Sequence, residues 1–421
     1  MKINRAGLAT ATALIAVASL VTSAATVSAA GGVDMKIGIV LPLTGNLSAY
    51  GPPMSQAAAL GVQQVNAAMV ADNVPGSCTV AGTEDDQASP PQSVEAANKL
   101  VLTDGANALV GPMTSGTTMA AAEAVTTPNG IPLISPAASS VDLALLDDSD
   151  TVFQVYPSDA LQAKAVVLAM AKQFGKKALV NVGARNDAYG TALAATFKTA
   201  WTANGGRIGV IDIYDPNAAT YDSDAAKIVS GKPDAFFIID FEQTFAKVAP
   251  ALARTKKWSV AHTYMTESFN DANSIKTVGA QYLNGAHGTA AAPAGTATAA
   301  WKTAFQSVVP TAQQSFVDPA AYDAAVIECL GAIYAKTNKG PALTKGIRAV
   351  SGPSGTPYSW EQLNQAVTAV AAGKKIAYKG AWSEVDFDST GAPGSGTFEI
   401  YHIVGGIPVD THSNVFYKAK K

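Results

Sequence analysis

Short apolar strands that alternate with Ala-rich helical stretches constrain the fold of this 421-residue chain more than any other feature. The first unit is a strand at Met35–Leu41, a Pro/Gly loop at Pro42–Gly51 and a helix at Met54–Val70. Further strands are expected at Ala108–Val110, Ile131–Ile134, Lys177–Val182, Ile208–Tyr214 and Ala235–Ile239, and further helices at Thr117–Val125, Leu161–Phe174 and Thr191–Asn204. Strands that alternate with helices of this length predict an α/β fold whose parallel sheets are covered on both faces.

The length of the chain favours two domains. About 390 residues follow the first thirty, which is more than one hydrophobic core usually serves. The segment Phe153–Asp159 closes one set of strand–helix units and opens a second set of similar design, so we predict two sheets. The last third returns to helices at Ala299–Val308, Ala320–Thr337 and Trp360–Ala372, followed by short strand patterns at Ala381–Phe387 and Gly396–Val404.

The first thirty residues have the pattern of a signal peptide. Lys2 and Arg5 precede an apolar stretch at Leu8–Val21, and small residues then lead to a cleavage site after Ala29 or Ala30. The apolar stretch is shorter than the roughly 20 residues of a membrane span, although an uncleaved anchor is the alternative. No cysteine lies near the cleavage site to carry a lipid. We therefore expect an exported protein, free in a periplasm-like space.

Charge and cysteine content exclude several partners. The formal net charge is −3, and it is −5 once Lys2 and Arg5 are removed. The chain therefore lacks the excess of positive charge expected of a protein that binds nucleic acid or an anionic membrane. Cys78 and Cys329 fit no metal-ligand spacing. An oxidising compartment permits a disulfide between them, but the sequence leaves open whether their backbones approach closely enough.

The sequence lacks the motifs of the common catalytic sites. It has no Gly-x-Ser-x-Gly elbow, no His-Glu-x-x-His pair and no phosphate-binding loop, and its four histidines show no ligand spacing. Asp85 and Asp86 are adjacent on a strand and therefore point to opposite faces. We expect no catalytic residues, no metal and no cofactor, and the chain is not expected to be an enzyme.

Candidate binding residues lie in the loops that lead from strands into helices. In open parallel sheets ligands bind beyond the carboxyl ends of the strands, where the free N–H groups of helix N-termini suit a carboxylate. The loop Gly111–Gly116 offers the hydroxyls of Thr114 and Ser115 as donors to such a ligand. Alternatively, either residue caps its helix. The next loop, Ser135–Ser140, has the same two interpretations.

Three further side chains have two interpretations each. Tyr50 and Tyr189 both precede a glycine at the start of a helix. Either ring could form an apolar wall for a ligand while its hydroxyl stays wet, or it could cover the edge of its own lobe. Glu267 follows an expected strand and could pair with a ligand ammonium in a closed cleft, or it could be a solvated loop residue.

Taken in order, the loops and their flanks resemble a known family. The matching segments are Ile37–Gly45, Tyr50–Gly51, Glu84–Gln87, Leu109–Pro112, Ile131–Pro136, Ala188–Gly190, Lys232–Ala235, Ala321–Ala324, Tyr378–Ala381 and Asp386–Asp388. From Lys36 to about Gly406 the chain resembles the type I periplasmic binding proteins of the leucine/isoleucine/valine-binding kind, which serve branched-chain amino-acid uptake by ABC importers. Each segment is weak alone, but their order and spacing are typical of that family.

The resemblance assigns roles to individual residues. It places the carboxylate donor at Ser115, in the loop that it shares with Thr114, and the ammonium-binding acid at Glu267. The carbonyl and the hydroxyl of the second binding loop fall on Ala137 and Ser139, where the family usually has Thr at the latter position. The aromatic side chains that flank the ligand fall on Tyr50, Tyr189 and Phe241. Phe241 cannot donate the hydrogen bond that a tyrosine there could donate, and Cys78 and Cys329 do not reproduce the cysteine pair of some relatives.

The resemblance also implies an architecture and a role. It implies two Rossmann-like lobes with parallel sheets around a hinged cleft, as in type I periplasmic binding proteins. Lobe 1 would comprise residues 31–156 and 286–373, and lobe 2 residues 157–285 and 374–421, with crossings near Pro157, Ala286 and Gly373. The expected protein is a monomer that captures an amino acid, most readily a hydrophobic one, and docks on a membrane permease. The alternatives are another small carboxylate or amide as ligand, a ligand sensor, and a hydrolase on a related fold.

Overall fold

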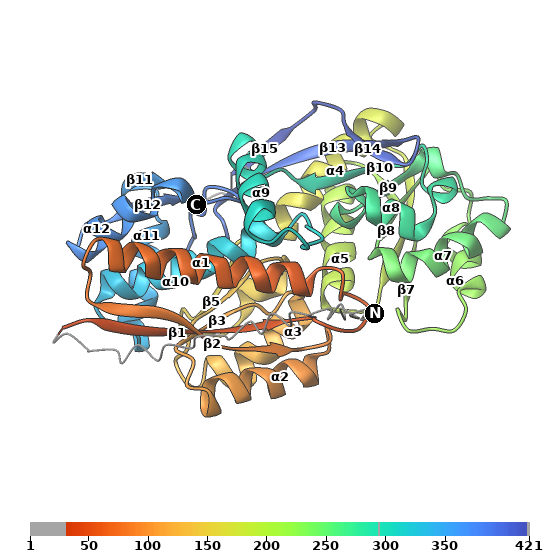
Figure 1. Ribbon diagram of the computed structural model, residues 1–421. Helices are drawn as coiled ribbons and strands as arrows, with labels where there is room; N and C mark the ends of the chain where they lie inside the picture. The colour runs from red at the N-terminus through yellow and green to blue at the C-terminus, as the bar shows by residue number, and fades with distance from the viewer. Residues whose placement is uncertain (1–30, 294, 419–421) are drawn as a thin grey trace, which may run out of the picture.

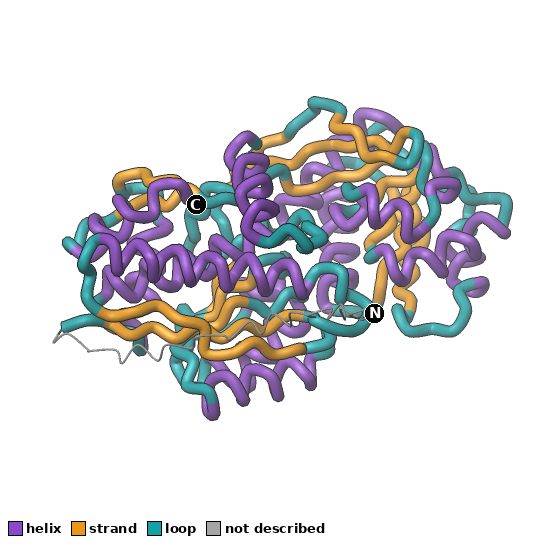
Figure 2. Tube along the Cα trace, viewed as in Figure 1, coloured by secondary structure: helices purple, strands orange, loops and turns teal. Residues whose placement is uncertain are grey.

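The computed structural model describes residues 31–293 and 295–418, and it has two α/β lobes that lie side by side (Figure 1). The expected signal peptide lies outside these residues. Each lobe has a central sheet with helices on both faces (Figure 2). We call the lobe built on the five-stranded sheet lobe A and the lobe built on the eight-stranded sheet lobe B.

Lobe A has a parallel sheet in the order β2-β1-β3-β4-β5. Its strands are β1 (Val33–Leu41), β2 (Gly76–Asp85), β3 (Ala108–Val110), β4 (Leu133–Ser135) and β5 (Val152–Gln154). One face carries α1 (Gly51–Ala71), α10 (Asp318–Ala335), α11 (Gly340–Ser351) and α12 (Leu363–Ala371), and the other carries α2 (Pro90–Asn98) and α3 (Ser115–Ala121). The short strands β11 (Thr356–Ser359) and β12 (Ile376–Lys379) pair with each other beside α12.

Burial from both sides explains the apolar runs in these strands. Ile37 and Ile39 of β1 are fully buried in the core formed with α1 and α10, whereas Val40 is fully buried in the core formed with α2 and α3. Successive side chains of a strand point to opposite faces, so a strand covered on both faces needs apolar residues at nearly every position. This is the physical origin of the pattern in the sequence.

Lobe B has the strand order β14-β13-β10-β9-β8-β6-β7, and β15 also pairs with β13. Its strands are β6 (Leu179–Arg185), β7 (Arg207–Tyr214), β8 (Ala235–Ile239), β9 (Thr263–Met265), β10 (His287–Ala291), β13 (Ser395–Val404), β14 (Ile407–Asp410) and β15 (Val415–Lys418). The helices α4 (Asp159–Phe174) and α5 (Ala188–Ala203) cover one face, and α6 (Asp222–Ile228), α7 (Glu242–Arg254) and α8 (Ala272–Val278) cover the other. The helix α9 (Thr296–Val308) leads back to lobe A.

The structure corrects two expectations about strands. The sheet of lobe B is mixed, because β13 runs antiparallel to β10, β14 and β15. The strand expected at Ala381–Phe387 does not form. Instead, the N–H groups of Ala381 and Trp382 donate to the buried carboxylate of Asp323, at 2.8 and 2.7 Å, which turns the chain at this point.

The chain crosses between the lobes three times, and two of the crossings lie later than expected. It leaves lobe A between β5 and α4, returns between Ala291 and Thr296, and leaves again between Lys379 and Ser395. The positions near Ala286 and Gly373 were wrong, because β10 pairs with β9 in lobe B and β12 pairs with β11 beside the helices of lobe A.

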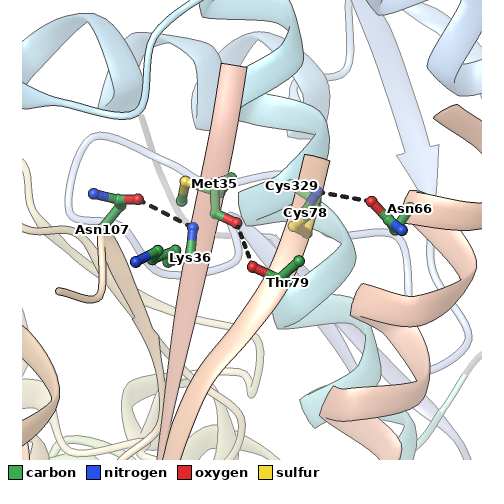
Figure 3. The surroundings of a disulfide bond; sticks show 7 residues. All are labelled: Met35, Lys36, Asn66, Cys78, Thr79, Asn107 and Cys329. Atoms are coloured by element: carbon green, nitrogen blue, oxygen red, sulfur yellow. Dashed lines mark hydrogen bonds between the residues drawn. A yellow bond between two sulfur atoms is a disulfide. The ribbon is translucent and has the colours of Figure 1, made fainter. Parts of the chain in front are cut away.

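A disulfide joins Cys78 of β2 to Cys329 of α10, with the Cα atoms 6.0 Å apart (Figure 3). These residues are 251 positions apart in the sequence, so the bond ties the first segment of lobe A to the segment that returns after lobe B. The question that the sequence left open is therefore answered by the structure. Stable disulfides are typical of oxidising compartments, which agrees with an exported protein.

Candidate functional site

A cavity lies between the lobes at the carboxyl ends of the strands. It encloses about 370 Å³ not filled by protein atoms, its opening to solvent included. Its walls are Met113, Thr114, Ser115, Ala137, Ser139, Tyr156 and Phe316 on the side of lobe A, and Tyr189, Phe241 and Glu267 on the side of lobe B. Seven of the eight residues singled out from the sequence lie here, and Tyr50 does not. Their contact with a ligand remains a prediction.

Ser115 joins the two binding loops of lobe A. Its Oγ accepts the N–H groups of Ser139 and Ser140, at 3.3 and 3.2 Å, and only 2% of the residue is exposed. The capping role belongs to its neighbour, because the Thr114 side chain accepts from the N–H of Thr117. Within the described part of the chain, the hydroxyl proton of Ser115 has no acceptor. This proton is therefore available to an oxygen atom in the cavity.

Glu267 forms a buried carboxylate on the opposite wall. Its Oε2 accepts from Nε2 of Gln162 at 2.6 Å, and its Oε1 accepts from the Tyr189 hydroxyl at 3.1 Å. Burial raises the pKa of Glu267, and these two donors oppose the rise. A solvated loop residue would not be held in this way, so the structure excludes that interpretation.

Asp159 is a second buried carboxyl near Glu267 that the sequence did not single out. It is fully buried at the first position of α4, and no donor in the described residues makes a well-formed hydrogen bond to either oxygen. Burial raises the pKa of Asp159 well above its ordinary value, and the Glu267 carboxylate raises it further. An acid in the first turn of a helix ordinarily interacts with the helix dipole, so no sequence pattern distinguishes this role.

Aromatic rings form the apolar walls between these polar ends. The Tyr189 and Phe241 rings are 5.7 Å apart on the lobe B side, and the Tyr156 and Phe316 rings are 6.4 Å apart on the other side. Tyr156 and Phe316 were not predicted. Phe316 lies in the loop between α9 and α10, and only the return of the chain to lobe A brings it to the cavity.

Tyr50 lies behind the cavity wall rather than in it. Its hydroxyl donates a 2.8 Å hydrogen bond to Oε2 of Glu242, and its ring packs edge-on against Phe316 with the centroids 5.9 Å apart. The direct wall role expected for Tyr50 is therefore replaced by a contact with Phe316 and a bond to the other lobe.

Arg185 supports the lobe B wall from behind. Its guanidinium lies 4.5 Å from the centroid of the Phe241 ring and pairs with Asp187 and with Asp240, the latter at 3.4 Å. Asp187 in turn caps α5, because its side chain accepts from the N–H of Gly190 at 2.8 Å. Burial raises the pKa of Asp240 to about 7, and Arg185 opposes the rise. These contacts position Phe241 and the start of the helix that carries Tyr189.

Two features are absent from the described residues. No group of three or more His, Cys, Asp or Glu side chains there is arranged to hold a metal ion. None of the helices of residues 31–293 and 295–418 has the length and apolar character needed to cross a membrane.

Two α/β lobes that enclose a small cavity, with a hydroxyl donor on one wall and a carboxylate on the other, define a two-lobed ligand-binding protein. The chain belongs to the periplasmic binding protein family, whose model matches residues 34–379. It is 32% identical over 204 residues to the Leu/Ile/Val-binding protein BraC3 of Rhizobium johnstonii, a match that covers 48% of this chain and 54% of the relative. The chain thus spans about half the length of the curated relatives that it matches.

Solved structures show the same fold at low sequence identity. A leucine-binding protein from Thermotoga maritima has a TM-score of 0.73 at 16% identity, covering 90% of this chain and 98% of the other. A branched-chain amino-acid binding protein from Streptococcus pneumoniae, in complex with isoleucine, has a TM-score of 0.70 at 18% identity, covering 91% and 99%. A solute-binding protein from R. palustris, in complex with benzoate, has a TM-score of 0.68 at 19% identity, covering 90% and 95%.

Proposed function

We propose that this protein captures a hydrophobic amino acid, most readily a branched-chain one, by closing its lobes and delivers it to the membrane permease of an ABC importer. The observation that carries the proposal is the placement of Ser115 and Glu267. They line opposite walls of one cavity, and the walls between them are apolar. A zwitterion with an apolar side chain matches this arrangement of charge.

Ser115 binds the carboxylate end of the proposed ligand. Its hydroxyl oxygen already accepts two N–H groups, so its proton points to another acceptor, and a ligand carboxylate is the acceptor that the family resemblance suggests. A hydrogen bond to a charged oxygen in a buried site is stronger than one between neutral groups. Ser139 lies in the same wall, and its side chain also interacts with the buried Asp159 carboxyl.

Glu267 binds the ammonium end of the proposed ligand. A buried carboxylate with a raised pKa is unfavourable by itself, and a cation beside it removes that cost. Asp159, buried behind the cavity wall, lies close enough to be affected by the charge of Glu267, so a cation at this end of the cleft would be favoured by both acids. The carbonyl group of Ala137 is a neutral acceptor in the same cavity, as the family resemblance implies for the ammonium.

The remaining walls select an apolar side chain. Met113, Phe241 and Phe316 offer no hydrogen-bonding group to the ligand, and the hydroxyl of Tyr189 is already bonded to Glu267. A polar ligand side chain in contact with them would lose its water without gaining a partner, which is unfavourable.

The wider role follows from the family and from the compartment. The disulfide and the expected signal peptide both favour an exported protein, and the family includes proteins that bind amino acids for uptake. The protein acts as a monomer that binds without chemical change and docks on its permease in the closed form. Residues 1–30 supply the export signal and are removed near Ala29 or Ala30.

A simple carboxylate is the second candidate ligand, because a protein of the same fold binds benzoate. A thermal-shift screen followed by calorimetry separates the two candidates. Leucine, isoleucine and valine should stabilise the mature protein, whereas 4-methylpentanoate, which lacks the amine, and 3-methylbutylamine, which lacks the carboxylate, should not. If 4-methylpentanoate binds as tightly as leucine, the ammonium role of Glu267 is wrong and the second candidate is correct.

A further inference from the structure

A second hollow adjoins the ligand cavity. Thr114, Ser115 and Tyr189 line both spaces. The second hollow, which we call the outer chamber, encloses about 1150 Å³ not filled by protein atoms, its opening to solvent included. Its other walls come from the β1–α1 and β2–α2 loops of lobe A and from the β6–α5 and β7–α6 loops of lobe B. Both lobes therefore contribute to it, as they do to the inner cavity.

The outer chamber offers hydrogen bonds rather than net charge. Four of its lining residues carry side-chain amides: Asn46, Gln87, Asn186 and Asn217. All four residues are exposed to solvent, so their side-chain amides are accessible to a ligand, and each amide can donate and accept. The charged side chains in the lining, Arg185 and Asp187, pair with each other. A neutral polar group such as a peptide or an amide matches this lining better than a second ion does.

The outer chamber meets the inner cavity at the carboxylate end of the proposed ligand. The two hydroxyl-bearing residues of the carboxylate end, Thr114 and Ser115, line both spaces. At the ammonium end Glu267 lines only the inner cavity, and Tyr189, which is bonded to it, lies between the two spaces. A group attached to the carboxyl carbon of the ligand would therefore enter the chamber. An amide there keeps the carbonyl oxygen that the Ser115 hydroxyl needs, and it adds an N–H group that the chamber amides can accept.

We propose that the cleft also accepts amino acids extended at the carboxyl group, namely α-carboxamides and dipeptides whose first residue is apolar. This inference rests on the proposed function, because the first residue must occupy the inner cavity. The amine must stay free, since Glu267 binds it. Extension at the amine is therefore excluded, and extension at the carboxyl group is accepted.

Calorimetry on the mature chain tests this with four probes: leucine, leucinamide, leucyl-glycine and N-acetyl-leucine. We expect the first three to bind and N-acetyl-leucine not to bind. Asn217→Trp fills the chamber from the exposed β7–α6 loop, and Asn217→Ala is the matched variant that keeps the space open. The Trp variant should bind leucyl-glycine roughly tenfold more weakly, by loss of the space for the second residue, and leucine with nearly unchanged affinity.

Each result distinguishes the two proposals. If leucine binds but neither leucinamide nor leucyl-glycine does, the inference is wrong and the proposed function stands. If none of the probes binds, the proposed function itself fails. If Asn217→Trp weakens leucine and leucyl-glycine equally, the second residue does not occupy the chamber. Asn46→Trp enters from the opposite wall and repeats the comparison should the first variant fold poorly.

Discussion

The hydroxyl of Tyr50 in lobe A donates a 2.8 Å hydrogen bond to Oε2 of Glu242, at the first position of α7 in lobe B. Both side chains are buried. Glu242 directly follows Phe241, which lines the cavity, and the Tyr50 ring packs against Phe316, which lines it from the other side. The bond therefore closes the cleft immediately behind the proposed ligand, and it exists only when the lobes are together.

Tyr50→Phe should weaken the binding of leucine, isoleucine and valine by a similar factor. The ring keeps its packing on Phe316, but the closed form loses one hydrogen bond, worth about 1 kcal/mol or roughly fivefold in Kd. Calorimetry with the three ligands measures the effect. Losses that differ strongly with the size of the ligand side chain would instead support a direct wall role for Tyr50.

Ser115→Ala should weaken leucine binding by roughly 1–3 kcal/mol, because it leaves a ligand oxygen and the two N–H groups of Ser139 and Ser140 without their partner. Thr114→Ala is the matched control, since it removes the cap of α3 but no bond between the loops. It should lower the thermal stability more than the affinity. Equal losses of affinity in both variants would contradict the carboxylate role of Ser115.

Leucine affinity should fall as the pH falls through the raised pKa of Glu267. Burial makes the ligand-free carboxyl hold its proton at a higher pH than an exposed glutamate does. The ligand ammonium stabilises the charged form, so binding releases a proton, and affinity is full above the raised pKa and is lost below it. Calorimetry over a pH series in two buffers of different ionisation enthalpy measures both effects. Glu267→Gln should bind weakly at every pH, and a pH dependence that survives in it would have to come from another group.

Glu328→Met should stabilise the protein at neutral pH by about 2–4 kcal/mol. Glu328 is fully buried in α10, neither carboxyl oxygen has a partner among the described residues, and burial raises its pKa well above the ordinary value.

As pH rises above the unfolded pKa, the unfolded chain loses the Glu328 proton while the folded chain keeps it. Stability therefore falls by roughly 1.4 kcal/mol per pH unit until the folded pKa is reached. Urea unfolding of both proteins over a range of pH measures this. The difference between variant and parent should shrink towards acidic pH, and a constant difference would mean that Glu328 does not keep its proton in the folded state.

Removing the disulfide should lower the free energy of unfolding by about 2–5 kcal/mol, because the bond closes a long loop in the unfolded chain. Cys78 and Cys329 are 251 residues apart and both are buried, so the double substitution Cys78→Ala and Cys329→Ala is the appropriate variant. Urea unfolding of the parent with and without reductant should reproduce the difference, whereas reductant should not affect the variant. Leucine affinity should change little, because neither cysteine lines the cavity.

Local patterns were sufficient to predict several of the strands and helices that carry the site, although not the helix α7 that follows Phe241. The strand at Ala108–Val110 and the strand at Ala235–Ile239 form as predicted, because strands buried on both faces leave a continuous apolar run. The strand predicted at Ala381–Phe387 does not form, because its backbone donors bind Asp323, which is 58 residues distant from the first of them. A contact of this kind leaves no periodic signal.

The sequence by itself determined the α/β class, the two-lobed division and the loops in which the cavity lies, because these depend on local hydrophobic periodicity and on the position of loops after strands. Only the tertiary structure decided which of those loops share a cavity and which buried side chains support its walls. Phe316 reaches the wall, Asp159 lies near Glu267, and Tyr50 bonds across the cleft to Glu242, through chain crossings that no local pattern encodes. The physical reason is that burial and pairing of these groups depend on side chains brought together over long sequence distances.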